Sequence, residues 1–203
     1  MNDTFEALRF HTLETNISYF KPRQDLPDRV KETSPAVDVM TDLRQVTVLM
    51  VSLTTPLSMA LERMIKGGVR MLLVTDADGK VQGLITSRDI QGEKPAKILE
   101  KTGGTQKDLM VGDIMTLKNK LEVLMMKDVL HAQVGDIIVT LKQVNRQHAI
   151  VVDHDPYKGE LAVRGIFSLS QIGQQLGLQI EPSQRATTFA DLEWAIEHGG
   201  AKP

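Results

Sequence analysis

The chain has 203 residues, of which 41% are hydrophobic and 25% are charged, and its formal net charge is -2 at pH 7. This length allows one generous domain or two small ones, and the composition is typical of a globular protein rather than a disordered or fibrous one. The balanced charge gives no reason to expect nucleic-acid binding, and no stretch of the sequence is apolar enough for a membrane helix.

The chain contains no cysteine, which excludes disulfides and thiolate chemistry and fits a reducing compartment. The first ten residues, MNDTFEALRF, have neither a basic segment nor a continuous apolar run, so we expect no secretory signal. We therefore predict a cytoplasmic protein that has no membrane partner and binds no nucleic acid.

Residues 1–34 predict an irregular arm, because prolines and charged residues follow one another without a helical or strand period. A helix follows, with Thr55 as its expected N-cap, Pro56 at its first position and Gly67-Gly68 at its end. One face of this helix carries the apolar residues Leu57, Ala60, Leu61, Met64 and Ile65.

Two apolar runs, 71–74 and 81–85, predict strands joined by the turn TDADGK. The DADG within it is similar to the start of a calcium loop, but the other ligands of such a loop are missing, so we predict a hairpin turn. The second run leads into Thr86, and an acid, Asp89, follows three residues later. This spacing is that of a helix-capping box, and it also places a carboxylate at a helix start, where a ligand could bind.

The same order of elements recurs downstream. DIMT at 113–116 repeats DVMT at 38–41, AIVVD repeats LLVTD, and RGIFSLSQIG repeats QGLITSRDIQG. The second helix repeats the apolar face with Val134, Ile137, Ile138 and Leu141. We predict two tandem β-α-β-β-α copies, each too small to bury its sheet alone, that pack into one α/β (α+β) module.

This repeat resembles the cystathionine-β-synthase (CBS) domain, which occurs in tandem pairs called Bateman modules. The resemblance rests on Asp-apolar-Met-Thr before each copy, on strands that end in Asp76 and Asp153, and on Gly-apolar-apolar-Thr/Ser at 83–86 and 165–168. It divides the chain into an N-terminal arm (1–34), a first CBS repeat (35–104), a second CBS repeat (105–179) and a C-terminal extension (180–203).

The resemblance implies a stand-alone regulatory module that binds an adenosine-containing ligand, such as AMP, ADP, ATP or S-adenosylmethionine. It also implies a homodimer. Since the chain holds almost only the module, we expect an effector protein as a further partner, of a kind that the sequence does not reveal. A ligand-free module for oligomerisation or partner binding is the alternative, and equilibrium dialysis against adenosine compounds distinguishes the two.

A carboxylate can accept hydrogen bonds from both hydroxyls of a ribose, and the resemblance assigns this clamp to Asp89, with Thr86 near the ribose or phosphate. The helix start at Asp89 adds free N–H groups that favour an anion. The remaining candidates comprise an apolar adenine slot and polar or cationic side chains for phosphates. They are Val48, Met71 and Leu72 for the slot, and Arg70, Arg88, His148 and Ser168 for the polar contacts.

The second copy departs from the pattern because Gln171 stands where Asp89 stands in the first copy. A neutral amide does not provide the same charged acceptor. Ser168 and Gln171 have the spacing of a capping box, and we predict that structural role for them. The ligand is therefore expected mainly at the first repeat.

We predict no metal site, because His131, His148 and His154 lack the helical spacing and the neighbouring carboxylates of metal ligands. The sequence also contains no phosphate loop, nucleophile elbow or paired catalytic carboxylates, so we predict that the protein is not an enzyme.

The two ends carry apolar residues outside the repeats. Phe5, Phe10, Tyr19 and Phe20 lie in the arm, and residues 188–199 predict a capped helix with one apolar face. Both extensions could fold back over the module, or they could bind a second subunit or a partner protein.

Overall fold

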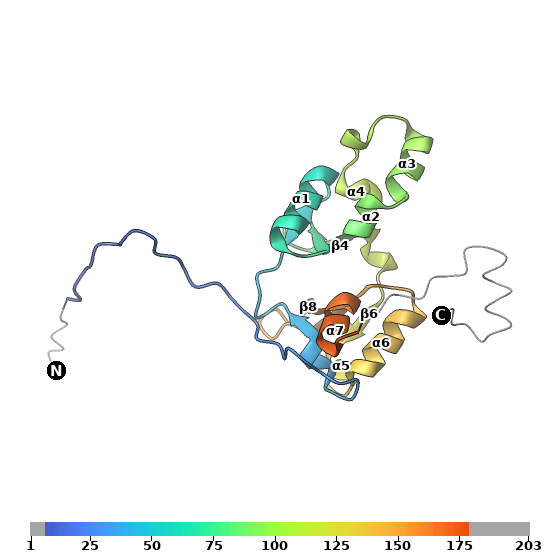
Figure 1. Ribbon diagram of the computed structural model, residues 1–203. Helices are drawn as coiled ribbons and strands as arrows, with labels where there is room; N and C mark the ends of the chain where they lie inside the picture. The colour runs from blue at the N-terminus through green and yellow to red at the C-terminus, as the bar shows by residue number, and fades with distance from the viewer. Residues whose placement is uncertain (1–6, 179–203) are drawn as a thin grey trace.

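The computed structural model describes residues 7–178 of the chain. Two units, each with one four-stranded sheet, lie one above the other in Figure 1. The first unit has the strand order β2-β3-β4-β5, and its main elements are β2 (Met50–Ser52), α1 (Leu57–Gly67), β3 (Met71–Thr75), β4 (Val81–Thr86) and α2 (Ser87–Gln91).

The second unit has the strand order β1-β8-β7-β6 and repeats this succession of elements. Its main elements are β6 (Val123–Met125), α6 (Val134–Gln143), β7 (His148–His154), β8 (Leu161–Ser168) and α7 (Leu169–Leu176). In both units the first strand pairs parallel with the central strand, which pairs antiparallel with the next one. The predicted α/β fold of two β-α-β-β-α repeats is confirmed.

Shorter elements precede and connect the two repeats. They are η1 (Ala36–Val39), β1 (Met40–Asp42), α3 (Lys94–Thr102), η2 (Gln106–Asp108), α4 (Val111–Ile114), β5 (Thr116–Leu117), η3 (Lys118–Lys120) and α5 (Met126–Val129).

The lead strands β1 and β5 exchange between the units. β1 precedes the first repeat but pairs antiparallel with β8, and β5 precedes the second repeat but pairs antiparallel with β4. The helical turns before these strands cross as well, because Val39 of η1 is buried in the second core and Val111 of α4 in the first. Each unit is therefore completed by the lead segment of the other repeat.

Helix α1 shows how the local sequence fixes an element. It ends as predicted, with Gly68 in the left-handed conformation (φ 63°). Pro56, rather than the predicted Thr55, occupies the N-cap position, and the Thr55 hydroxyl instead accepts a hydrogen bond from the N–H of Ser52 at 3.2 Å. Ile65, predicted on the buried face, is 71% exposed.

The N-terminal arm has two different parts. Gln24 packs along β1, accepting a hydrogen bond from the N–H of Asp42 (2.7 Å) and donating one to the carbonyl of Met40 (2.9 Å). Farther along the arm, the N–H of Val30 donates to the carbonyl of Gln175 in α7 (3.1 Å). These contacts close the outer edge of β1, so residues 24–35 cover the second unit.

Residues 7–20 do not cover either sheet, contrary to the expectation that the arm folds back. Phe10 and Phe20 are fully exposed, and Tyr19 is 74% exposed. This part of the arm runs away from both units (Figure 1). The helix expected at 188–199 lies outside the described residues, and within residues 7–178 no helix has the length and apolarity needed to cross a membrane.

A glycine recurs in β4 and β8 because the exchanged strands approach too closely for a side chain. A Cβ on Gly83 would lie 2.2 Å from the carbonyl oxygen of Thr116 in β5. A Cβ on Gly165 would lie 2.7 Å from the sulfur of Met40 in β1. Both are shorter than any normal contact, so the motif glycines serve the strand exchange.

We predict that Gly83→Ala lowers the free energy of unfolding by about 1–3 kcal/mol, because the β4 and β5 backbones must separate to admit the methyl group. Chemical denaturation measures this change. Gly135→Ala is the matched control, since its Cβ would meet the carbonyl oxygen of Glu32 at an ordinary 3.4 Å. Equal stability of the two variants would contradict the steric explanation.

Candidate functional site

Two clefts open between the units. The first cleft, of about 700 Å³ including its mouth, is lined by Leu84, Thr86, Arg88, Asp89, Lys94, Thr116, Leu121, Glu122, Arg146, Gln147, His148 and Ile150. The second cleft, of about 800 Å³, is lined by Thr41, Gly68, Val69, Arg70, Met71, His148, Ile166, Ser168, Ser170, Gln171 and Gln174. Both volumes include open space at the mouth of the cleft.

Asp89 is buried in the wall of the first cleft, with 9% of its surface exposed. Thr86 is the N-cap of α2, and its hydroxyl accepts a hydrogen bond from the N–H of Asp89 at 3.2 Å. The Oδ2 atom of Asp89 accepts hydrogen bonds from the N–H (2.9 Å) and the hydroxyl (2.7 Å) of Thr86. The predicted capping box therefore forms, and it holds the carboxylate in a fixed orientation.

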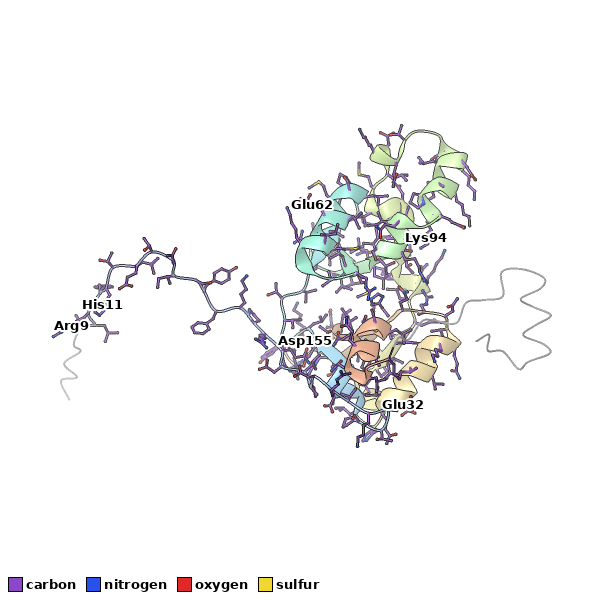
Figure 2. The ribbon with its side chains drawn as sticks, viewed as in Figure 1. Arg9, His11, Glu32, Glu62, Lys94 and Asp155 are labelled. Carbon is purple, nitrogen blue, oxygen red and sulfur yellow. The ribbon has the colours of Figure 1, made fainter. Side chains whose placement is uncertain are left out.

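The other oxygen of this carboxylate is occupied by a residue that the sequence analysis did not select. Lys94, the first residue of α3, forms an ion pair with Oδ1 of Asp89. Its Nζ also lies 3.4 Å from the carbonyl oxygen of Ile114, at the end of α4. Figure 2 labels Lys94 at the start of α3, beside α2. In the sequence, the feature that indicates this contact is the position of Lys94, five residues after Asp89 and directly before Pro95.

The far wall of the first cleft comes from the second unit. Arg146 lies 3.7 Å from the carboxylate of Glu122, and it also donates a hydrogen bond to the carbonyl of Lys120 (3.5 Å). Two more cations, Arg88 and Lys94, line the cleft from the first unit. Three cations thus face two carboxylates, which gives this cleft a small excess of positive charge.

The second cleft is formed by equivalent elements, but its polar side chains differ from those of the first cleft. Gln171 accepts a hydrogen bond from the hydroxyl of Thr41 at 3.3 Å, and Arg70 donates one to the hydroxyl of Ser170. The predicted capping box at Ser168 does not form, because its hydroxyl lies 3.1 Å from that of Ser170 and caps no helix N–H. Among residues 7–178, no carboxylate lines this cleft.

The predicted site residues thus separate into five groups by location. Thr86, Arg88 and Asp89 line the first cleft, Arg70, Met71 and Ser168 line the second, and His148 lines both. Leu72 is fully buried in the core of the first unit. Val48 is half-buried just before β2 and lines neither cleft.

His148 forms part of both clefts because it begins the central strand β7 between the units. Burial lowers the pKa of His148 from 6.5 to about 4, the charge of Arg70 lowers it as well, and Asp89 partly opposes both effects. The imidazole is therefore neutral at pH 7. Within residues 7–178, no group of three or more His, Asp or Glu side chains is arranged to hold a metal ion.

The lowered pKa of His148 predicts a pH-dependent stability. The unfolded chain binds a proton near pH 6.5 and the folded chain only near pH 4, so the contribution is complete above pH 6.5 and is lost between 6.5 and 4. This shift corresponds to about 3 kcal/mol of unfolding free energy. We predict that His148→Gln removes this component in denaturation curves measured across that range. A stability difference from wild type that does not vary with pH would contradict the assignment.

Comparison with known proteins supports the resemblance to the CBS domain. Residues 36–93 match the family model of the CBS domain. The resemblance stated from the sequence is therefore confirmed over the first repeat. Among curated proteins, none matches the chain in sequence.

Solved structures share the fold. An uncharacterized conserved protein from Pyrococcus horikoshii is similar with a TM-score of 0.51 and 22% identity, over 75% of this chain and 98% of that one. CBSX2 from Arabidopsis thaliana, in complex with AMP, gives a TM-score of 0.45 and 24% identity, over 68% and 93% of the two chains.

The CBS domain pair of protein MJ0100, in complex with 5'-methylthioadenosine and S-adenosyl-L-methionine, gives a TM-score of 0.49 and 22% identity, over 71% of this chain and 97% of that one. Likeness at these identities concerns the fold alone. The bound compounds are properties of those proteins.

Proposed function

We propose that the chain is a regulatory module that binds an adenosine-containing ligand, mainly in the first cleft. The observation that carries this proposal is the carboxylate of Asp89, which is buried and held by its capping box in the wall of an open cleft. The equivalent position of the second cleft is Gln171, which already bonds to Thr41. One cleft therefore offers a charged acceptor and the other does not.

Each part of such a ligand has a complementary surface in the first cleft. The ribose hydroxyls donate to Asp89, and the adenine ring packs against Leu84 of β4 and Ile150 of β7. Arg88 and Arg146 are within the same lining and favour a phosphate group. In this proposal these apolar residues take the place of Val48, Met71 and Leu72, the adenine slot that the resemblance implied.

We propose a regulatory rather than a catalytic role, in the cytoplasm, through an effector protein that responds to the occupied cleft. The ligands to test first are AMP, ADP, ATP and S-adenosylmethionine. AMP and S-adenosylmethionine are also compounds with which CBSX2 and MJ0100 were crystallised. The proposed bounds of the repeats remain 35–104 and 105–179, with their lead strands exchanged.

Asp89→Asn tests the proposal. A ligand present at a hundredfold excess over its Kd stabilises the wild type by about 2.7 kcal/mol. At roughly 2–4 °C per kcal/mol, the melting temperature should rise by several degrees. The variant keeps the size of the side chain but loses the charged acceptor, at a cost of about 1.5–3 kcal/mol in binding. The rise on adding ligand should therefore shrink or vanish, whatever the melting temperature of the unliganded variant.

Gln171→Ala is the control for the second cleft, and the ligand-induced rise should remain nearly intact. A rise that survives Asp89→Asn but disappears in Gln171→Ala would place the ligand in the second cleft. No rise with any of the compounds in the wild type would favour the ligand-free interaction module.

We also propose that the chain forms a homodimer, because its surface retains unusual apolar exposure. In addition to the aromatic residues of the arm, Met59 and Ile65 of α1 are 59% and 71% exposed. Sedimentation should give twice the 22.5 kDa mass of one chain. A monomer at micromolar concentration would contradict the proposal, and deletion of residues 1–21 tests whether the arm contributes.

A further inference from the structure

Both carboxylate oxygens of Asp89 already have partners in the structure. Its Oδ2 accepts two hydrogen bonds from Thr86, and its Oδ1 is paired with the ammonium group of Lys94. The Oδ2 contacts belong to the cap of α2, so they persist as long as the helix start persists. A ribose whose two hydroxyls both donate to Asp89 therefore competes with Lys94 for Oδ1.

The side chain of Lys94 is freer to change its conformation than that of Asp89. It is 49% exposed, compared with 11% for Asp89. A lysine has a flexible stem and a strongly hydrated ammonium group, so it can swing to another anion without disturbing the backbone. The one other carboxylate that lines the cleft, Glu122, lies near Arg146 on the opposite wall. A displaced Lys94 thus lacks an unshared carboxylate in the cleft.

An adenosine phosphate brings the missing anion with it. We propose that Lys94 passes from Asp89 to the phosphate of the ligand when an adenosine phosphate binds in the first cleft, an inference that rests on the proposed function. Asp89 then accepts the ribose hydroxyls in place of the ammonium group. Lys94 thus exchanges a carboxylate for a phosphate as its ion-pair partner, and the carboxylate of Asp89 exchanges the ammonium group for hydrogen bonds from the ribose hydroxyls.

This exchange makes Lys94 a specificity-determining residue. Adenosine, which has no phosphate, competes with Lys94 for the same oxygen of Asp89 without offering Lys94 a new partner. A lost charge-assisted contact of this kind weakens binding by about ten- to a hundredfold. The first cleft should therefore select adenosine phosphates over uncharged adenosine compounds and over the cationic S-adenosylmethionine.

The exchange also links the ligand to the surrounding helices. Lys94 is the first residue of α3 and connects it to Asp89 in α2 and to the carbonyl of Ile114 in α4. α4 leads directly into β5, the strand that crosses to the first sheet. When Lys94 leaves Asp89, the link between α2 and α3 is released, so ligand binding is transmitted to an exposed helix.

Separate isothermal titrations of the full chain with AMP, with adenosine and with S-adenosylmethionine, in the wild type and in Lys94→Met, test the inference. We expect the wild type to bind AMP at least about tenfold more tightly than adenosine, by the contact estimate above. The variant should bind AMP more weakly and adenosine more tightly, because the competitor for Asp89 is gone. Lys97→Met is the matched control: Lys97 lies one turn further along α3, pairs with Glu93 at 2.6 Å, and does not line the cleft.

Lys94→Arg, which keeps the charge, should retain the preference for AMP. If Lys94→Met binds AMP and adenosine in the wild-type ratio, or if the wild type prefers S-adenosylmethionine or adenosine to AMP, the exchange is wrong and the proposed adenosine site still stands. If the wild type binds none of the three compounds, the proposed function itself is wrong and the exchange is wrong with it.

Discussion

The exchange of the lead strands is the constraint on which the rest of the molecule depends. β1 completes the sheet of the second unit and β5 completes the sheet of the first, so neither four-stranded sheet forms from one continuous repeat. The crossing requires glycine at 83 and 165, where the passing backbone or side chain leaves no room for a Cβ. It also holds the units against each other, and the two clefts lie at this contact. Binding and folding therefore depend on the same strand pairs.

The two repeats share one fold, but their clefts are lined by different side chains. In both units a helix start follows the glycine-bearing strand and faces the other unit, but one start presents the carboxylate of Asp89 and the other the amide of Gln171. Between them, His148 lines both clefts and is neutral at pH 7 because burial and the charge of Arg70 disfavour its cationic form. The duplication thus provides two similar cavities, and the charges in each decide which ligand it favours.

Local features of the fold were predictable from the sequence because they depend on neighbouring residues. The end of α1 at Gly67-Gly68, the hairpin between β3 and β4, and the capping box of Thr86 and Asp89 all follow from short patterns. The repeat itself was visible because the same patterns recur in order. The exposure of Ile65 was missed, because helical periodicity defines an apolar face but not how much of that face the rest of the protein covers.

Most of the features that were missed depend on contacts between distant segments. No local pattern indicates that β1 pairs with β8 rather than with its own repeat, or that Leu72 points into a core instead of a cleft. Lys94 was overlooked because a lysine in a charged helix normally faces solvent. Only the packing of α3 against α2 brings it to Asp89. The capping box expected at Ser168 also fails through distant contacts, since Gln171 bonds to Thr41 of the exchanged strand β1 and Ser170 bonds to Arg70 of the other unit.

The central claim is that the first cleft, and not the second, is the ligand site. The most direct measurement is a crystal structure of the protein grown with saturating AMP. The account predicts electron density for one nucleotide per chain in the first cleft, with its ribose on Asp89, its phosphate beside Lys94 and no nucleotide near Gln171. Density for the nucleotide in the second cleft alone, or a ribose that makes no contact with Asp89, would contradict the account.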